Sequence, residues 1–500
     1  MRRLAGTALA LSVLTACTST HPKSAAPSPT SSAARPTATA LPPQQLRWTG
    51  CSDGFECARL RVPVDHSRPG GPTLSLAVIR LPASGPGSRL GSLVLNPGGP
   101  GASGVDYARR APTLVPAVVR ARYDVVGFDP RGIGGSEQVH CLSTAEMDRL
   151  MAFDPTADTP AQLAALDAEG RRVAAACSSH DPAFLARIGT VDTARDLDDL
   201  RAALGDAKLT YLGKSYGTFL GATYAELFPD RVRAFVLDGV VDPALTAETS
   251  DEQQAVAFET ALRRFLAACP RLGCGLGADA PRALDGLLAG LRGHPLTSRA
   301  DPSRPVTYGV GLIALVAGMY SRENGWPSLA LALALAARGD GTGLQELADA
   351  YSGRQPSGRY DGSLESNLAI NCVDRPYPRG KAAGDEEAVR LARVAPHFGP
   401  EIAFGSRACG YWPIAPTDRP HPVTAAGTPT MLLVGNTYDP ATPLVWAQGL
   451  SRELAHDVLL TVVRDGHTAY GGGRSQCVDQ AVNSYLLTLR APAPRTSCPA

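Results

Sequence analysis

A glycine–x–serine–x–glycine motif at residues 213–217 constrains the fold of this chain more than any other feature. The mostly apolar run 209–212 before it predicts a buried strand, and residues 219–227 predict a helix. A strand that turns sharply into a helix strains the central residue, and the two glycines allow neighbouring segments to approach closely. The hydroxyl of Ser215 is then exposed at the carboxyl end of a sheet, at a helix N-terminus that favours negative charge. This context predicts a nucleophilic serine.

Other short apolar runs predict the remaining strands of the same sheet. Helical patterns separate them, which is typical of an α/β fold, a mostly parallel sheet with helices on both faces. Loops at the carboxyl ends of such strands carry the chemistry. The expected strands, besides the one before the motif, are 74–81, 92–95, 123–128, 234–237, 430–434 and 458–463.

A nucleophilic serine needs a base that takes its proton and a third group that orients the base. Of the nine histidines, only His467 lies just past an expected core strand. The expected acid is Asp439, which follows the preceding core strand, and its rivals are Asp238 and Asp465. Asp238 is better explained as a loop-stabilising residue, and Asp465 is too close to His467 along the chain to reach its Nδ1. The order Ser215, Asp439, His467 is that of the α/β-hydrolase fold.

Such a serine also needs an oxyanion hole, formed by backbone N–H groups aimed at the charge of the tetrahedral intermediate. One donor should be the N–H of Tyr216, directly after the nucleophile. The other should come from the glycine-rich run 98–101, which follows the expected strand 92–95. We expect Gly99 to be this donor, with Gly98 as the alternative. The other interpretation of the run is a plain Gly-Pro turn.

The first 17 residues predict an export signal. Arg2 and Arg3 form its positive start, and residues 4–14 form an apolar core that is too short to span a membrane. Residues 14–17 resemble a bacterial lipobox, which implies cleavage before Cys17 and attachment of a lipid to its thiol. The alternative is ordinary secretion with cleavage nearby. We therefore expect an exported protein that a lipid anchors to the outer face of the cell membrane.

The rest of the chain divides by composition. Residues 18–44 are rich in Ser, Thr, Pro and Ala and predict a disordered tether. The α/β-hydrolase core occupies 45–242, with a helical insertion at about 137–190, and resumes at 426–500. Residues 243–425 contain several helical patterns and predict a helical cap that walls the site. The cap is inserted before the strand that carries the catalytic acid.

Charge and cysteine content narrow the possible partners. The 48 basic and 47 acidic residues give a net charge of +1 without a basic stripe, so no nucleic acid is expected. Without Cys17, ten cysteines remain, an even number that predicts disulfides in an exported chain. No C-x₂-C pair occurs, so no metal site is expected, and no cofactor is implied. A sequence does not determine connectivity, but close spacings and the simplest non-crossing completion suggest Cys51–Cys57, Cys141–Cys177, Cys269–Cys274, Cys372–Cys409 and Cys477–Cys498.

Five motifs follow one another in the chain: Asn96–Gly101, Asp129–Ser136, Gly213–Gly217, Asn436–Pro443 and Gly466–Thr468. The set resembles the actinobacterial tripeptidyl aminopeptidase family, a relative of the prolyl aminopeptidases, from about Trp48 to Cys498. The resemblance implies a serine exopeptidase that releases short fragments, such as tripeptides, from a free peptide N-terminus. It also implies a secreted or lipid-anchored protein. In prolyl aminopeptidases a histidine commonly precedes the glycines, whereas this chain has Asn96-Pro97, so no preference for an N-terminal proline is implied.

An exopeptidase of this kind must recognise an ammonium group, so a carboxylate of the cap should face the site. Asp374 is the expected residue, because a disulfide at Cys372 would hold it rigidly and the family carries a similar Ala-Ile-x-Cys-x-Asp run. The other interpretation is that Asp374 caps a helix or pairs with Arg375. Glu323 and Glu365 are weaker candidates.

Two other functions remain open. A carboxylesterase or lipase could use the same triad and oxyanion hole, because fold alone does not select the substrate. A non-catalytic solute-binding lipoprotein is the other, although it would need neither triad nor hole. The expected partners are a peptide substrate and, through the lipid, a membrane, and we expect a monomer.

Overall fold

A ten-stranded sheet organises the computed structural model, which describes residues 44–178 and 181–499. Its strands are β1 (Thr49–Ser52), β2 (Phe55–Pro63), β3 (Thr73–Leu81), β4 (Gly91–Asn96), β5 (Tyr123–Phe128), β6 (Leu209–Lys214), β7 (Val232–Asp238), β8 (Met431–Tyr438), β9 (Asp457–Asp465) and β10 (Ser497–Cys498). The order across the sheet is β1-β2-β3-β5-β4-β6-β7-β8-β9-β10. Three strand pairs are antiparallel, namely β1 with β2, β2 with β3, and β3 with β5. All the other pairs are parallel. The expected mostly parallel sheet is confirmed.

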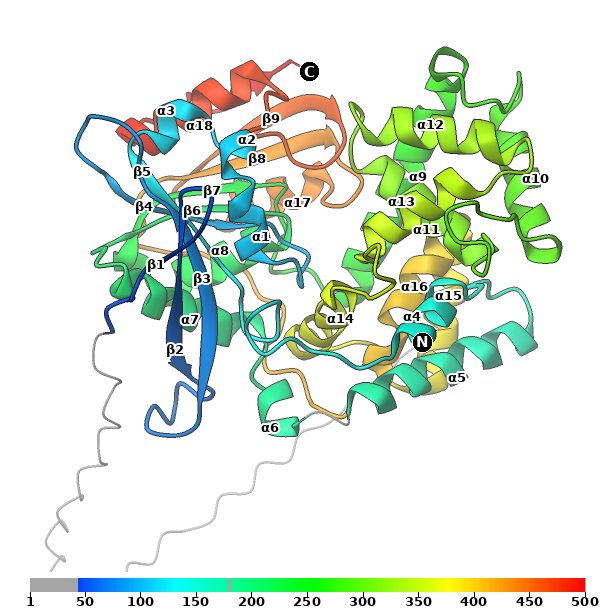
Figure 1. Cartoon of the computed structure of the whole chain (residues 1–500), viewed down its shortest axis with the longest axis horizontal. Helices are drawn as coiled ribbons and strands as arrows, with labels where there is room; N and C mark the ends of the chain where they lie inside the picture. Colours follow the sequence, from blue (N-terminus) through cyan, green and yellow to red (C-terminus); the bar gives the residue numbers. More distant parts are fainter. Residues whose placement is uncertain (1–43, 179–180, 500) are drawn as a thin grey trace, which may run out of the picture. The chain divides into compact units, whose positions relative to one another are not determined.

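Helices cover both faces of the sheet (Figure 1). They are α1 (Gly104–Arg109), α2 (Ala111–Leu114), α3 (Ala117–Arg120), α7 (Thr190–Ala203), α8 (Tyr216–Leu227), α17 (Leu444–Glu453) and α18 (Gln476–Thr488), with a short 3₁₀ helix η1 (Pro229–Arg231). Helices α7, α8 and α17 share a hydrophobic core with Phe235 of β7, whereas α2, α3 and α18 share one with the next residue, Val236. Adjacent strand residues point to opposite faces, so a strand covered on both faces is apolar throughout.

Between β7 and β8 the chain leaves the sheet and forms a helical cap. Its helices are α9 (Ala247–Leu272), α10 (Ala280–Gly293), α11 (Tyr308–Met319), α12 (Gly325–Ala336), α13 (Thr342–Ser352), α14 (Ser363–Asp374), α15 (Gly380–Val394) and α16 (Gly399–Arg407), followed by the 3₁₀ helix η2 (Ala408–Tyr411). Figure 1 shows these green and yellow helices gathered beside the sheet. The cap has its own hydrophobic core, which includes Phe265, Leu312 and Trp326. Helix α11 is apolar nearly all round because it lies in the middle of that core.

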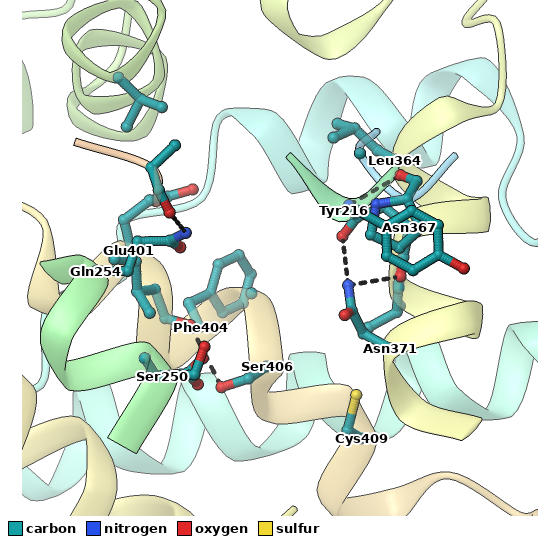
Figure 2. Close-up of a pocket in the computed structure, with 18 of the residues that line it drawn as sticks. Tyr216, Ser250, Gln254, Leu364, Asn367, Asn371, Glu401, Phe404, Ser406 and Cys409 are labelled. Carbon is teal, nitrogen blue, oxygen red and sulfur yellow. Dashed lines mark hydrogen bonds between the residues drawn. The ribbon is translucent and has the colours of Figure 1, made fainter. Parts of the chain in front are cut away.

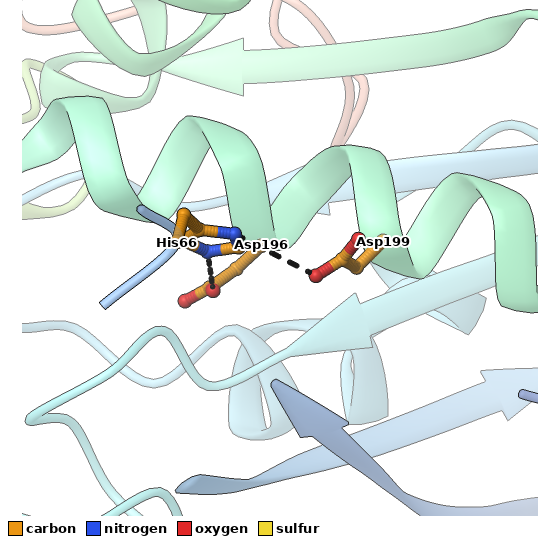
Figure 3. Close-up of side chains that lie close together, drawn as sticks. All are labelled: His66, Asp196 and Asp199. Carbon is orange, nitrogen blue, oxygen red and sulfur yellow. Dashed lines mark hydrogen bonds and ion pairs between the residues drawn. The ribbon is translucent and has the colours of Figure 1, made fainter. Parts of the chain in front are cut away.

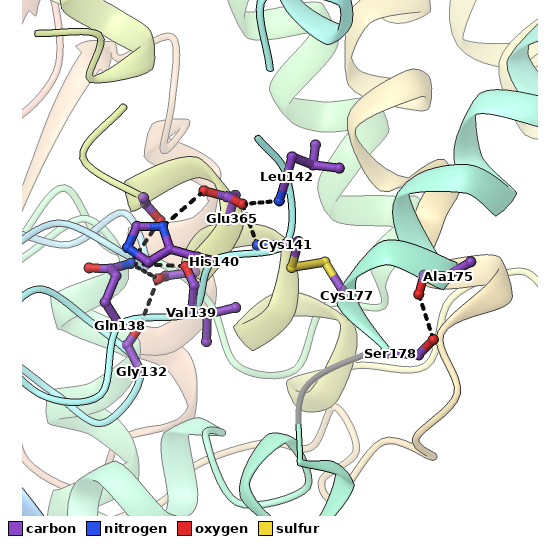
Figure 4. Close-up of a disulfide and its surroundings, with 12 residues drawn as sticks. Gly132, Gln138, Val139, His140, Cys141, Leu142, Ala175, Cys177, Ser178 and Glu365 are labelled. Carbon is purple, nitrogen blue, oxygen red and sulfur yellow. Dashed lines mark hydrogen bonds and ion pairs between the residues drawn. A yellow bond between two sulfur atoms is a disulfide. The ribbon is translucent and has the colours of Figure 1, made fainter. Parts of the chain in front are cut away.

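A second helical excursion lies between β5 and α7. It contains α4 (Thr144–Met151), α5 (Pro160–Cys177) and α6 (Pro182–Leu185). The Cys141–Cys177 disulfide joins its first part to the end of α5 (Figure 4). Glu365 of α14 accepts hydrogen bonds from the N–H groups of Cys141 and Leu142, the latter at 2.8 Å. The insertion is therefore attached to the cap as well as to the core.

The described cysteines form all five expected disulfides: Cys51–Cys57, Cys141–Cys177, Cys269–Cys274, Cys372–Cys409 and Cys477–Cys498. The signal segment 1–17, its Cys17 and nearly all of the tether lie outside the described residues. Among the described helices, none combines the length and the apolar character needed to cross a membrane.

Candidate active site

Ser215 lies at the turn between β6 and α8, as the motif predicts. Its φ of 55° and ψ of −127° are unusual for a residue with a side chain and persist only when the surroundings impose them. Here the Ser215 N–H donates to the Asp238 carbonyl at 3.0 Å, and the Ser215 carbonyl accepts from the Thr218 N–H at 2.8 Å. A Cβ on Gly217 would lie 2.7 Å from Oδ1 of Asn96, and one on Gly213 would overlap the Gly217 carbonyl. Both glycines of the motif are therefore sterically required.

His467 and Asp439 meet at the carboxyl ends of the neighbouring strands. Nδ1 of His467 lies 2.9 and 3.0 Å from the two carboxylate oxygens of Asp439. The Asp439 side chain is fully buried and accepts hydrogen bonds from the N–H groups of Ala441 at 3.0 Å and Thr442 at 2.9 Å. A carboxylate held in this way orients the imidazole and leaves Nε2 free to accept a proton.

The nucleophile follows β6 and the base follows β9, so both lie at the carboxyl-end edge of the sheet. Ser215 is hydrogen-bonded to the last residue of β7, and a Cβ on the next residue, Gly239, would lie 3.0 Å from Cε1 of His467. Among the hydrogen bonds between described residues, none joins Ser215 Oγ to Nε2 of His467. In structures without substrate this bond is often long and shortens when the substrate binds.

Asp238, a rival for the catalytic acid, stabilises the loop that follows the base. Its carboxylate accepts hydrogen bonds from the N–H groups of Ala469 and Tyr470, each at 2.9 Å. It also lies 3.3 Å from Nζ of Lys214, whose ammonium group donates to the Tyr470 carbonyl at 2.6 Å. This is the loop-stabilising role that the sequence suggested for Asp238.

The glycine-rich loop after β4 lies directly against the nucleophile. A Cβ on Gly98 would be 2.8 Å from Cβ of Ser215 and 3.1 Å from the backbone nitrogen of Tyr216. The Gly98 N–H already donates to Oδ1 of Asn96 at 2.9 Å. In the described part of the chain, no acceptor is found for the N–H groups of Gly99 and Tyr216. Gly99 is therefore the better choice for the second oxyanion donor.

A cavity of about 360 Å³ opens beside Ser215 (Figure 2). The core, the insertion and the cap all contribute to its walls. Most of the lining is apolar, and two carboxylates of the cap, Asp251 and Glu401, also face it. Figure 2 shows Glu401 and Gln254 on one side of the cavity, and Tyr216, Asn367 and Asn371 on the other. Its apolar lining residues include Leu150, Val173, Phe219, Phe258, Ile313 and Phe404.

The two cavity carboxylates differ in their partners. Burial raises the pKa of both Asp251 and Glu401 to about 7. The hydroxyl of Ser406 hydrogen-bonds to Asp251, and the nearby charge of Arg375 lowers its pKa in part. No hydrogen bond or ion pair from another described residue reaches the side chain of Glu401. Glu401 is thus a carboxylate in the cavity wall with no hydrogen-bond or ion-pair partner among the described residues, an arrangement that favours a cationic ligand.

The expectation that Asp374 faces the site requires correction. Its carboxylate accepts from the N–H of Thr190 at 2.7 Å and from the Thr190 hydroxyl at 2.6 Å, and it does not line the cavity. Because Thr190 begins α7, Asp374 caps that helix, which was the alternative interpretation. The weaker candidates are also engaged elsewhere, since Glu323 pairs with Arg464 at 2.9 Å and Glu365 binds the insertion. The sequence analysis identified neither Asp251 nor Glu401, because the packing of the cap helices determines which cap residues lie near Ser215.

One further group of ligand-type side chains consists of His66, Asp196 and Asp199 (Figure 3). His66 Nε2 lies 2.8 Å from Asp196, whose other oxygen accepts from Nε of Arg131 at 2.7 Å. The Arg131 guanidinium is fully buried and also donates to the carbonyl of Val64 at 2.9 Å. Because Arg131 supplies the positive charge that Asp196 requires, we regard this cluster as structural.

The nucleophile lies at a strand–turn–helix junction, the acid and the base follow later strands, and the glycine-rich loop lies against the nucleophile. This arrangement defines a serine hydrolase of the α/β-hydrolase fold. Comparison with known families agrees. Residues 91–313 match the alpha/beta hydrolase fold family, and residues 395–498 match the family described as TAP-like protein.

The chain is also similar to curated proteins over most of its length. It is 38% identical over 483 residues to the serine protease Hip1 of Mycobacterium tuberculosis, covering 91% of each chain. It is 37% identical to carboxylesterase B of the same organism, covering 91% of this chain and 90% of that one. It is 32% identical to the tripeptidyl aminopeptidase of Streptomyces lividans, covering 91% of this chain and 86% of that one. The chain therefore belongs to the tripeptidyl aminopeptidase family of α/β-hydrolases.

Proposed function

We propose that this protein is an exported serine aminopeptidase that releases short N-terminal fragments, such as tripeptides, from peptides with a free N-terminus. The observation that carries the proposal is the unpaired carboxylate of Glu401 in the cavity beside Ser215. A relative named tripeptidyl aminopeptidase and one named serine protease support it. A carboxylate in this position binds an ammonium group and has no evident use with a neutral ester.

The reaction follows from the geometry of the site. Ser215 Oγ attacks the peptide carbonyl while His467 takes its proton, and the imidazolium then protonates the leaving amine. Asp439 keeps Nδ1 of His467 protonated and oriented. The N–H groups of Tyr216 and Gly99 stabilise the oxyanion, and water then hydrolyses the acyl-enzyme.

Glu401 would act at a distance from the reacting carbonyl. It lies across the cavity from Tyr216, next to the nucleophile, so a substrate whose ammonium group meets Glu401 must span the cavity to reach Ser215 (Figure 2). The wall that carries Glu401 would therefore limit the number of residues between the N-terminus and the cleaved bond. This arrangement is typical of an exopeptidase that counts from the N-terminus.

The test is mass spectrometry of the products from an unblocked peptide and from its N-acetylated twin. Release of short N-terminal fragments from the free peptide alone supports the proposal. If neither peptide is cleaved while a fluorophosphonate still labels Ser215, the triad is functional and the peptidase proposal is wrong. Cleavage of both peptides at internal bonds would point to an endopeptidase instead.

A carboxylesterase is the second candidate, because one relative at 37% identity carries that name. The same triad and oxyanion hole hydrolyse esters. Competition between a peptide amide and short acyl esters separates the two functions. For an esterase, the ester would be preferred and the substitution Glu401→Gln would not change its KM.

We also propose that a lipid on Cys17 anchors the protein outside the cytosol. The lipobox-like residues 14–17 support the anchor, and five disulfides fit an oxidising compartment. Metabolic labelling with palmitate tests the anchor. Cys17→Ser should remove the label and release the protein into the medium.

A further inference from the structure

The turn that follows α11 in the cap is bonded directly to the loop that carries the catalytic base. The N–H of His467 donates to the carbonyl of Tyr320 at 2.8 Å, and Ser321 forms an isolated β-bridge with Gly466. The ring of Tyr320 meets the imidazole edge-on, with 5.4 Å between centroids and 89° between planes. The cap therefore contacts both the backbone and the ring of the base.

Ion pairs reinforce this contact. Asp465, two residues before His467, has a side chain that is only 3% exposed. It binds Arg322 of the turn at 3.2 Å and Arg264 of α9, whose Nη2 lies 3.1 Å from Oδ2. Arg264 also lies over the ring of Tyr438, 3.5 Å from its centroid and next to the catalytic acid. Leaving a buried carboxylate without its arginine partners strongly destabilises the folded protein. These ion pairs therefore hold the loop of His467 to the cap.

The core also holds this loop. Asp238 binds the N–H groups of Ala469 and Tyr470 after the base, and Nδ2 of Asn436 donates to the Gly466 carbonyl before it at 2.7 Å. The cap adds the contacts of Arg322 with Asp465 and of Tyr320 with His467. The segment before His467 is therefore bound by both the core and the cap, so the position of His467 depends in part on how the cap packs against the core.

The same cap helix lines the cavity. Ile313 and Val316 of α11, and Tyr320 at its end, all face the space beside Ser215. A substrate in the cavity therefore contacts the helix whose C-terminal turn holds the base. Packed interiors transmit displacements of this kind because they have little free volume.

We propose that Asp465 is a positioning residue, which sets the place of His467 by joining its loop to Arg264 and Arg322 of the cap. The proposal concerns the proton-transfer step, so it applies equally to a peptide and to an ester. It does not depend on the aminopeptidase assignment. A misplacement of the base by about 1 Å costs on the order of a hundred-fold in rate.

The test compares Asp465→Asn and Arg322→Met with the wild type, with kcat expressed per active site titrated by fluorophosphonate. We expect kcat to fall about ten- to a hundred-fold in Asp465→Asn and about three- to ten-fold in Arg322→Met, with KM within about two-fold. Arg322 is about half exposed, so its variant should fold even if Asp465→Asn does not. Arg322→Lys keeps the charge and should restore most of the lost kcat.

The matched control is Asp349→Asn, which breaks a cap ion pair with Arg304 of 2.7 Å and leaves both arginine partners of Asp465 in place. It should lower the melting temperature and leave kcat per active site unchanged. Peptide and ester substrates should show the same loss in the Asp465 and Arg322 variants. If Arg322→Met, and Asp465→Asn where it folds, lower only the melting temperature and keep kcat within two-fold, the proposal is overturned.

Discussion

At the level of single residues, the protonation state of Glu401 sets the charge of one wall of the cavity. A glutamate with a pKa near 7 is largely neutral in mildly acidic solution and charged in mildly basic solution. An ammonium group placed beside it would favour the charged form and lower the pKa again. Substrate binding and ionisation of Glu401 are therefore linked.

The substitution Glu401→Gln should raise KM for free-amine peptides about ten- to a hundred-fold, because a hydrogen bond to a charged partner contributes about 1.5 to 3 kcal/mol. The kcat value should change little, since Glu401 lies across the cavity from the reacting atoms. Steady-state kinetics on one peptide series measures both. The matched control is Glu323→Gln, a cap carboxylate that is bonded to Arg464 and does not line the cavity. An unchanged KM in Glu401→Gln together with a raised KM in Asp251→Asn would move the ammonium site to Asp251.

The raised pKa of Glu401 also predicts the direction of a stability change with pH. Between its ordinary pKa of 4.5 and about 7, the folded state holds more protons at this site than the unfolded state. Stability must then fall as pH rises through that window, and level off above it. Denaturant unfolding at pH 5 and pH 8 should show that the wild type loses about 1 to 3 kcal/mol more than Glu401→Gln. Equal losses in the two proteins would mean that Glu401 titrates normally.

At the scale of elements, the junction of β4 and β6 builds the reacting centre. The turn after β6 presents Ser215, and the loop after β4 lies against it closely enough that only glycine fits at position 98. Two parallel neighbouring strands end at the same edge of the sheet, so two loops meet there without any long-range adjustment.

Gly98→Ala should lower kcat about a hundred-fold or more, because the new Cβ would displace Ser215 and the N–H of Tyr216. Single-turnover kinetics on a chromogenic substrate measures the loss. Gly205→Ala is the control, since Gly205 has a similar positive φ of 77° but open space around it. That variant should show the backbone strain alone, as a lower melting temperature with normal kcat. A normal kcat in Gly98→Ala would mean that the loop is not part of the oxyanion hole.

At the scale of the whole molecule, core, insertion and cap act as one unit because they share a cavity. Ser215 comes from the core, Leu150 and Val173 from the insertion, and Glu401 from the cap. Arg407 at the end of α16 joins the cap to the insertion, because its Nη2 lies 3.1 Å from Asp167 of α5. Unfolding of the insertion should therefore open the cavity.

The disulfide of the insertion tests this dependence. Removing Cys141–Cys177, which closes a loop of 36 residues, should cost about 4 kcal/mol by loop entropy, and KM for peptides should rise. Removing Cys51–Cys57, with a separation of 6 at the sheet edge, should cost about 2 kcal/mol and leave KM unchanged. Thermal unfolding and peptide kinetics of the two double-serine variants give the comparison. Equal KM values would show that the insertion does not shape the cavity.

Short stretches of chain encode the features that could be predicted from the sequence. The strands before Ser215, Asp439 and His467 are nearly continuous apolar runs, so their position and order could be predicted. Close spacings and the simplest non-crossing arrangement suggested the cysteine pairs without determining them. The edge strands β1 and β10 and the neighbouring strand β2 were missed, because short or half-exposed strands have little apolar pattern of their own.

Long-range packing sets which charged residues face the cavity and which hold the scaffold together. Asp374, Glu365 and Asp465 are each bonded to segments more than a hundred residues away in sequence, and no local pattern encodes such contacts. Glu401 faces the cavity for the same reason, since its place depends on how α16 packs against α9 and α5. The chemistry of the nucleophile is thus local, whereas the set of side chains that face the cavity arises from long-range packing of the cap.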